Sequence, residues 1–593
     1  MCGIIGFIGN KNASEIIYNG LKHLEYRGYD SVGVAYIKSK DVVIKKDVGK
    51  LNEVNSKLNF LDVKSNIGLG HCRWATTGAV TKENAHPHTD CNNIIVVVHN
   101  GIIENYLELK NDLIKKGHNF RSDTDTEVFS HLIEQKMKEG KSFEEACSIA
   151  SRIIQGTAAL VIANTEEEKL IGIKIGSPLV LGVSDFGYFL ASDIPAFLNY
   201  TKKVIFLKDF EMVVLDKSGY RIYTIDESAK MHETEKKVYT IDWDAEQAEK
   251  GSFDHFMIKE ILEQVDAISN ASIQDVKKLE KFSEKILKSD KIFFVASGTS
   301  YHASLVGSYL MNKICGISTI PIIASEFSHY INSINDKTLI IAISQSGETY
   351  DVLEAVRLAK NKGAKIFSIV NVNGSTLTWE SDDYLLMNCG PEIGVAATKT
   401  YSAEIVLLEL IACFVAKKFE EGKMKINYLR NIIYNLTSES SRNAIKDIAK
   451  FLRDKSNLFL IGRGLLYPTA MEGALKIKEI SYIHAEAFAG GELKHGTLSL
   501  IEDGVPVIAL IDEATKDSTL SNAREVKARK GIVIGVSPFH DEAFDFWIKV
   551  PECNNLNPIA FIIPLQLLAY YLAVLRGFDP DKPRNLSKSI TVK

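Results

Sequence analysis

The chain has few cysteines for its length, and none of them form a CxxC pair. The eight cysteines are spread over 593 residues, which argues against both a disulfide framework and a zinc ribbon. The formal net charge is only -5, so the protein has no general attraction to nucleic acid or to an anionic membrane. The first residues lack the basic leader and long apolar core of a signal peptide. We therefore expect a globular protein of a reducing, cytoplasmic setting.

Long hydrophobic runs are also scarce. One stretch, from Pro558 to Leu575, has roughly the length of a membrane span. Pro564 and Gln566 interrupt it, and no second run resembles a span. We predict a buried helix that packs on a sheet.

The first part of the chain is rich in short β-branched runs separated by turns, with few helical segments. This pattern is typical of an α+β layered domain built on antiparallel strands. The sequence becomes polar and charged between residues 226 and 252. We place a first domain at residues 1–225 and a linker at residues 226–252.

The remainder alternates strands, glycine or serine turns, and helices, which predicts a parallel sheet with helices on both faces. Three strand-like runs recur at a constant offset of 166 residues; the first pair is Ile292–Val295 and Leu458–Ile461. A constant offset predicts two copies of one α/β doubly wound domain. We place the copies at residues 253–425 and 450–580, followed by a tail at residues 581–593.

Two turns of the first copy are rich in hydroxyl groups. Residues 344–349 read Ser-Gln-Ser-Gly-Glu-Thr, and residues 297–300 read Ser-Gly-Thr-Ser; each turn follows a strand and precedes a helix. Hydroxyls and backbone N–H groups at a helix N-terminus suit a phosphate dianion. Neither turn contains a nucleotide-binding fingerprint, and ordinary serine N-caps are the alternative reading. The second copy has Asp512-Glu513 instead, and carboxylates would repel phosphate.

The second copy carries acid–base candidates in their place. Glu472, Lys476 and Glu479 occur at helical spacings and can share one helix face. His495 stands in a glycine-rich segment. A solvated helix face and a plain loop are the simpler explanations, but beside a phosphate site these groups suit sugar-phosphate chemistry.

The second residue, Cys2, combines two reactive groups if Met1 is removed. Its free α-amino group could then accept the proton of its own thiol, which makes a nucleophile with a built-in base. The alternative is that cysteine follows Met1 by chance.

Other polar groups of the first domain could serve such a nucleophile. The Arg73 guanidinium could bind a carboxylate through two hydrogen bonds, and Asp125 could pair with an amine. Asn100 and the Gly101 N–H could form an oxyanion hole. Zinc binding is an alternative function of this region. Its possible ligands follow no spacing typical of zinc, and we expect no metal site; they are His71, Cys72, His86, His88 and Cys91.

Several motifs together resemble the glutamine:fructose-6-phosphate amidotransferase (glucosamine-6-phosphate synthase) family. They run from residue 2 to the tail in the family's order: Cys2–Gly6, Glu25–Ser31, Arg73–Thr76, His86–His88, His99–Asn105, Ser344–Thr349, Glu472–Lys494 and Pro583–Leu586. The resemblance implies an N-terminal-nucleophile hydrolase domain, a four-layer αββα sandwich that acts as a glutaminase. It also implies that the two copies are sugar-isomerase (SIS) domains.

The resemblance assigns a role to each matching residue of the glutaminase domain. Cys2 would attack the glutamine amide, with Asn100 and Gly101 stabilising the oxyanion. Arg73, Thr76 and Asp125 would bind glutamine. Trp74 would gate an internal ammonia channel. Thr77 departs from the pattern, because the bacterial members have histidine there.

In the isomerase half, the resemblance implies that Lys588 forms a Schiff base with the ketose. Glu479, assisted by Lys476, would move a proton between C1 and C2, and His495 of a neighbouring subunit would open the sugar ring. This arrangement implies a homodimer, with glutamine and fructose 6-phosphate as substrates and no metal or organic cofactor. The sugar-phosphate-binding positions would be Thr299, Ser300, Ser344, Gln345, Ser346, Thr349 and Val395.

Three alternatives stay open at this stage. Another amidotransferase could use the same cysteine with a different acceptor, although the Ser-Gly-Gly-x-Asp-Ser motif of ATP-dependent acceptor domains is absent. The SIS pair could belong to a sugar-phosphate-sensing regulator. The chain could also be a plain sugar-phosphate isomerase with an inactive glutaminase.

Overall fold

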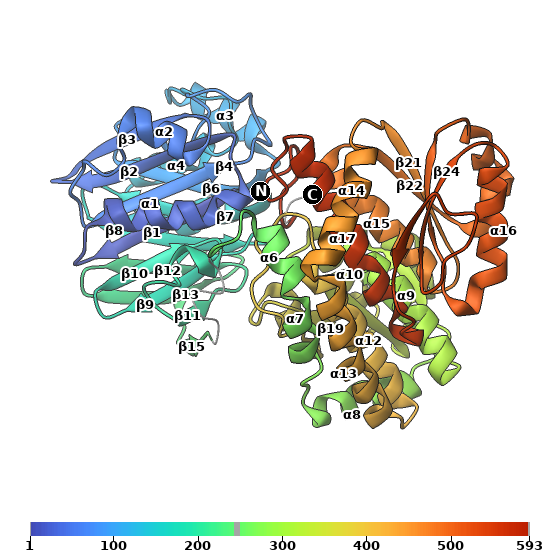
Figure 1. The fold of residues 1–593 in the computed structure, drawn as a ribbon. Helices are drawn as coiled ribbons and strands as arrows, with labels where there is room; N and C mark the ends of the chain where they lie inside the picture. The colour runs from blue at the N-terminus through green and yellow to red at the C-terminus, as the bar shows by residue number, and fades with distance from the viewer. Residues whose placement is uncertain (1, 242–249, 591–593) are drawn as a thin grey trace. The chain divides into compact units, whose positions relative to one another are not determined.

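A computed structural model describes residues 2–241 and 250–590, which form two compact units (Figure 1). The first unit contains residues 2–241 together with the tail segment 587–590. The second contains residues 250–586. Each unit has its own sheets and core.

The first unit is built on two antiparallel sheets. One has eight strands in the order β15-β11-β9-β10-β1-β4-β2-β3. Its strands are β1 (Gly3–Gly9), β2 (Ser31–Lys38), β3 (Asp41–Val48), β4 (Ile67–Arg73), β9 (Val180–Ser184), β10 (Gly187–Ala191), β11 (Lys203–Phe206) and β15 (Tyr239–Thr240). The other has seven strands in the order β14-β13-β12-β8-β7-β6-β5. Its strands are β5 (His88–Thr89), β6 (Ile95–Ile103), β7 (Gly156–Asn164), β8 (Lys169–Ile175), β12 (Glu211–Asp216), β13 (Gly219–Ile225) and β14 (Met231–Glu233).

Side-chain alternation along the strands separates this unit into four layers. Ile5 of β1 packs with the helices α1 (Ala13–Leu24) and α2 (Leu51–Leu58), whereas its neighbour Ile4 packs between the sheets against Val96 of β6. The opposite face of the seven-stranded sheet is covered by α3 (Tyr106–Lys115), α4 (Glu127–Lys138) and α5 (Phe143–Ile153). The predicted αββα sandwich is confirmed.

Two of these strands fall within the segment that we placed in the linker. β14 pairs with β13, and β15 pairs with β11, so both sheets extend beyond residue 225. Residues 242–249 of that segment lie outside the described residues.

The second unit contains two five-stranded sheets, and every pairing within them is parallel. Their orders are β17-β16-β18-β19-β20 and β22-β21-β23-β24-β25, so the second sheet repeats the first strand by strand. The predicted pair of doubly wound domains is confirmed. The strands are β16 (Lys291–Ala296), β17 (Ile320–Ile323), β18 (Thr338–Ser344), β19 (Lys365–Val370), β20 (Asp383–Leu386), β21 (Asn457–Gly462), β22 (His484–Ala489), β23 (Pro506–Leu510), β24 (Ile532–Ser537) and β25 (Phe546–Lys549).

Helices from both copies share one hydrophobic core. The central helix, α17 (Asn557–Leu575), is apolar on all sides and packs against helices of both copies. The stretch Asn554–Leu575 is long and apolar enough to cross a membrane, but 83% of its most apolar 18-residue window is buried inside the protein. The helix is buried as we predicted, although its main contacts are with other helices rather than with a sheet. The other helices of this unit are α6 (Phe256–Leu262), α7 (Gln264–Ala271), α8 (Val276–Lys288), α9 (Gly298–Cys315), α10 (Tyr350–Asn361), α11 (Thr376–Glu380), α12 (Lys399–Val415), α13 (Phe419–Leu436), α14 (Glu439–Leu452), α15 (Leu466–Ser481) and α16 (Lys516–Lys527).

Candidate active sites

The Cys2 thiol lies at the start of β1, beside the end of β4. Its Sγ donates to the carbonyl oxygen of Trp74 (3.3 Å) and accepts the Trp74 backbone N–H (3.2 Å). Burial raises the pKa of the Cys2 thiol above its ordinary value. The thiol is therefore mostly protonated at neutral pH, and a nearby base is needed to activate it.

The Asn100 side chain faces Cys2 across the two sheets. Its Nδ2 donates to the Cys2 carbonyl oxygen at 2.6 Å. Its Oδ1 lies 3.1 Å from His71 Nε2, which fixes the orientation of the amide. The next residue, Gly101, has φ 144°, and a Cβ there would stand 1.9 Å from the Thr157 carbonyl oxygen. Only glycine fits this position of β6.

Arg73 and Asp125 are both close enough to Cys2 to act on its pKa, Arg73 lowering it and Asp125 raising it. The Arg73 guanidinium donates to the carbonyl oxygens of a loop that begins at Thr77, three in all. A substrate carboxylate would have to displace some of these bonds. Asp125 accepts the Ile103 N–H at 2.8 Å. Thr76 is exposed, and the Trp74 ring packs edge-on against Tyr29.

The hydroxyl-rich turn of the first SIS copy connects β18 with α10. Ser344 Oγ accepts the Gly347 N–H (3.1 Å) and lies 3.0 Å from Thr349 Oγ1. Ser346 Oγ accepts the Glu348 N–H at 3.2 Å. Gly347 has φ 65°, and a Cβ there would stand 2.1 Å from Ser375 Oγ, so the turn requires glycine. Gln345 is half-buried in the same turn.

The other predicted phosphate residues stand at the start of α9. The Thr299 hydroxyl donates to Glu472 Oε1 (3.0 Å) and accepts from Lys476 Nζ (3.2 Å), both on α15 of the second copy. The Ser300 hydroxyl donates to Glu404 Oε1 at 2.7 Å. The start of α9 is thus connected directly to the acid–base candidates of the other copy.

The Lys476 ammonium is completely buried between two carboxylates. Its Nζ lies 2.6 Å from Glu479 Oε2 and 3.3 Å from Glu472 Oε1. Burial alone would lower the pKa of Lys476, but the two carboxylates raise it above its ordinary value. Lys476 therefore stays charged at neutral pH. Glu472 also accepts a hydrogen bond from His302 of α9 at 2.8 Å.

Within the second unit, the structure does not bring His495 to Lys476 and Glu479. His495 ends the 3-10 helix Gly490–His495, is exposed, and contacts neither Lys476 nor Glu479 through a hydrogen bond or ion pair among the described residues. Val395 is buried, and its N–H donates to the Asp581 carbonyl oxygen. Lys588 belongs to the tail segment that groups with the first unit.

Comparison with known proteins covers both units. The glutamine amidotransferase domain profile matches residues 71–199, and the SIS domain profile matches residues 285–413 and 451–576. The chain is 48% identical to a glutamine–fructose-6-phosphate aminotransferase (isomerizing) of Thermococcus kodakarensis over 612 residues, with 100% of both chains covered. It is 47% identical to the enzyme of the same name from Pyrococcus horikoshii, again over 100% of both chains.

The chain belongs to the glutamine–fructose-6-phosphate aminotransferase family. Its second unit also resembles the solved C-terminal domain of glucosamine-fructose-6-phosphate aminotransferase from Francisella tularensis. That match has a TM-score of 0.52 at 35% identity and covers 56% of this chain and 99% of the other.

Sequence reasoning missed several buried partners in this aminotransferase-family chain. Arg27 Nε donates to the Cys2 carbonyl oxygen (3.3 Å), and Arg27 also pairs with Asp193 at 2.9 Å. Arg27 was part of the Glu25–Ser31 motif, but no local pattern links it to a carboxylate 166 residues away. The His302–Glu472 contact was missed for the same reason.

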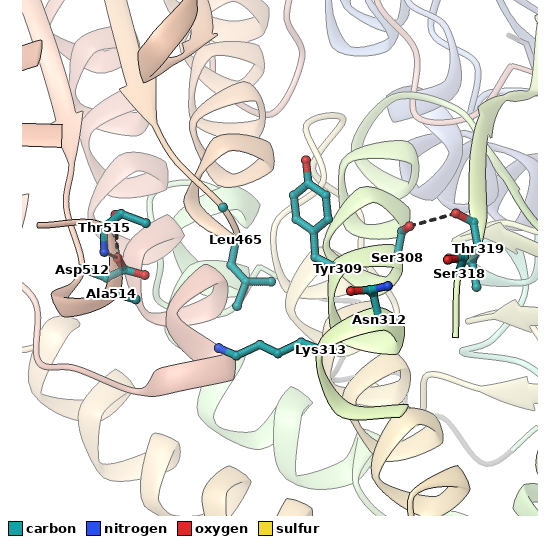
Figure 2. A pocket seen from close by; sticks show the side chains of 11 residues that line it. Ser308, Tyr309, Asn312, Lys313, Ser318, Thr319, Leu465, Asp512, Ala514 and Thr515 are labelled. Atoms are coloured by element: carbon teal, nitrogen blue, oxygen red, sulfur yellow. Dashed lines mark hydrogen bonds between the residues drawn. The ribbon is translucent and has the colours of Figure 1, made fainter. Parts of the chain in front are cut away.

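A cavity of about 500 Å³ lies between α9 and the carboxyl edge of the second sheet (Figure 2). The Lys313 side chain extends from α9 toward Leu465 in this view. On the opposite wall of the cavity, Asp512 Oδ1 accepts a hydrogen bond from the Thr515 N–H at 2.9 Å. None of the sugar-phosphate-binding residues predicted from the family resemblance lines this cavity; the lining residues are Ser308, Tyr309, Asn312, Lys313, Ser318, Thr319, Gly464, Leu465, Asp512, Ala514 and Thr515.

Proposed function

We propose that this protein transfers the amide nitrogen of glutamine to fructose 6-phosphate and isomerises the product to glucosamine 6-phosphate, releasing glutamate. The observation that carries the proposal is identity of 48% over the whole length of an enzyme of that name, which includes both units. The Cys2–Asn100 site in one unit and the Lys476–Glu479 pair in the other supply groups suited to the two half-reactions. A cytoplasmic setting fits these small polar substrates.

In the glutaminase reaction, the Cys2 thiolate attacks the amide carbon and the thiol proton passes to the Cys2 α-amine. This step requires removal of Met1, which lies outside the described residues. The Asn100 Nδ2 and the Gly101 N–H stabilise the oxyanion, since Nδ2 already points toward Cys2. Ammonia leaves and water releases glutamate from the thioester. Arg73, Thr76 and Asp125 hold glutamine, and Trp74 gates the path of ammonia.

In the isomerase reaction, Lys588 forms a Schiff base with C2 of the opened ketose. Ammonia then displaces the Lys588 amine from C2. Glu479 moves a proton from C1 to C2, and the Lys476 ammonium 2.6 Å away stabilises its carboxylate. His495 opens the ring. The hydroxyl turn and the start of α9 bind the sugar phosphate through Thr299, Ser300, Ser344, Gln345, Ser346 and Thr349, with Val395 lining the site.

A coupled assay tests this function. The purified protein is given glutamine and fructose 6-phosphate, and glutamate and glucosamine 6-phosphate are measured together. We expect equal amounts of the two products, no synthesis from Cys2→Ala, and normal synthesis from the control Cys147→Ala, a buried residue of α5. Lys588→Ala should lose synthesis while keeping some glutamine hydrolysis. Glutamate without amino sugar would disprove the assigned acceptor.

We further propose a homodimer in which each isomerase site receives His495 from the partner. The exposure of His495 and its lack of contact with Glu479 within the chain support this arrangement. The His495→Ala and Glu479→Ala chains are mixed in equal amounts, unfolded and refolded together, so that half of the dimers are hybrids. Each hybrid has one complete site, and we therefore expect the mixture to regain about a quarter of wild-type synthesis. No recovery from hybrids isolated by two affinity tags would place His495 within its own chain.

A further inference from the structure

Four side chains of the first unit form a compact cluster away from Cys2: Cys91, His118, His131 and Glu134. One potential ligand atom from each lies within 4.8 Å of all the others. We call them the Cys91 cluster. Cys91 follows β5, His118 follows α3, and the other two residues stand one turn apart on α4. Three separate segments of the chain therefore meet at one point.

The distances within the Cys91 cluster fit a tetrahedral ion. The two Nδ1 atoms of His118 and His131 are 3.2 Å apart, and Cys91 Sγ lies 3.9 Å and 3.7 Å from them. Glu134 Oε2 lies 2.9 Å and 3.2 Å from the same nitrogens. Zinc bond lengths predict separations of about 3.3 Å between two nitrogens or a nitrogen and an oxygen, and about 3.6 Å between nitrogen and sulfur.

The contacts of the two Nε2 atoms, on the side of each imidazole ring that faces away from the cluster, indicate which ring nitrogens carry lone pairs. Gln135 Nε2 donates to Glu139, so its Oε1 faces His118 Nε2 as an acceptor at 3.0 Å. The Nε2 of His118 must then carry the hydrogen, which leaves a lone pair on Nδ1. His131 Nε2 faces a carboxylate oxygen of Glu127 at 3.6 Å, which favours the same tautomer. This use of the second ring nitrogen is typical of metal-bound histidine.

Three lone-pair atoms thus converge on one point, and they repel one another unless a positive charge stands between them. A proton on one imidazole would remove the repulsion in two of the three contacts. It would not explain why the Cys91 thiol occupies the fourth ligand position of a tetrahedron. The side chains of His118, His131 and Glu134 are almost completely buried, while Cys91 is half-exposed and offers a route for entry. Lys138 pairs with the other carboxylate oxygen of Glu134 at 2.8 Å.

We propose that the Cys91 cluster binds one structural zinc ion that holds the connection between α3 and α4 in place. A thiolate, two imidazoles and a carboxylate leave no open position, as in structural rather than catalytic zinc sites. The connection carries Asp125, which we assigned to the glutamine amine. Sequence reasoning gave no metal site here. The histidines it weighed lie elsewhere, with the rings of His71 and His86 stacked at 3.9 Å.

Metal content tests this proposal independently of activity. Full-length protein from zinc-supplemented culture, dialysed against metal-free buffer, should contain one zinc per chain by mass spectrometry. Cys91→Ser should lose most of it, and the control Cys315→Ser, with a half-exposed thiol in the second unit, should keep it. Less than 0.2 zinc per chain in the wild type, even after reconstitution with about one equivalent of zinc, would overturn the proposal.

Two further measurements do not depend on a variant that folds. Cobalt(II) added to metal-free wild-type protein should give thiolate charge-transfer and tetrahedral absorption bands. Removing zinc by a chelator should lower the melting temperature of the first unit by about 8 °C if the ion is present at a thousand times its Kd, and added zinc should restore it. Octahedral cobalt bands without a thiolate band, or a melting temperature unchanged by the chelator, would overturn the proposal.

Discussion

Replacing Glu472 with glutamine should destabilise the second unit. The side chain is completely buried and accepts hydrogen bonds from Thr299, His302 and Lys476. Glutamine keeps the shape and one carbonyl oxygen, so the main loss is the charge facing Lys476. Removing one partner of a buried ion pair costs about 3–5 kcal/mol. Because Lys476 keeps Glu479 at 2.6 Å, we expect the lower end, about 3 kcal/mol.

This loss converts into a measurable shift in melting temperature. The second unit has a core that both copies share, so we expect it to unfold as one unit of roughly 340 residues. Its unfolding entropy is then about 0.7 kcal/mol per kelvin, and Glu472→Gln should lower its melting temperature by about 4 °C. Differential scanning calorimetry resolves this transition from that of the first unit, which should not move.

An exposed ion pair provides the control. Glu284 and Lys288 of α8 lie 3.2 Å apart with about 70% of each side chain exposed. Glu284→Gln should change the melting temperature by less than about 1 °C, since exposed pairs contribute little. A Glu472→Gln shift no larger than that of the control would refute the argument that the charge of Glu472 stabilises buried Lys476.

Three further predictions concern the first unit. Because burial raises the pKa of Cys2, its alkylation by iodoacetamide should accelerate with pH up to and beyond pH 9; a plateau below pH 8 would contradict this. Asn100→Ala should lower the glutaminase kcat by about 100- to 1,000-fold with little change in KM, and a loss below about fivefold would exclude an oxyanion role. Burial lowers the pKa of His71 to about 3, so below pH 6.5 the unfolded chain binds a proton that the folded chain does not. His71 alone should therefore lower the unfolding free energy of this unit by about 1.7 kcal/mol between pH 6.5 and pH 5. Urea titrations measure this fall, and a constant unfolding free energy would disprove the assignment.

Local sequence patterns predicted the elements but not the long-range pairs. The β-branched runs were sufficient for an α+β domain of antiparallel strands, and the 166-residue repeat for the two parallel sheets, because strand alternation and strand–turn–helix order are local signals. The turn at Ser344–Thr349 was predictable for the same reason. The four-layer αββα order came from the family resemblance. Contacts such as Arg27 with Asp193 follow from the pairing of distant strands, which no spacing within one segment encodes.

The Cys91 cluster shows this limit most clearly. Its members are separated by 27, 13 and 3 residues, and only the last interval, on one face of α4, has a helical period. The other two depend on how the α3–α4 connection folds back over the sheet. Cys91 was weighed as a ligand, but with histidines that pack elsewhere.

The all-apolar α17 has a consequence for how the protein is made. It is among the last helices to leave the ribosome, yet it packs against α6, α12 and α13, which are synthesised much earlier. Until residues 557–575 emerge, the first copy exposes the apolar surfaces that α17 will cover, and no closed core exists for either copy. The N-terminal sandwich can fold during translation, whereas the isomerase half has to wait for the end of the chain. We therefore expect nascent chains that stop before residue 557 to bind chaperones.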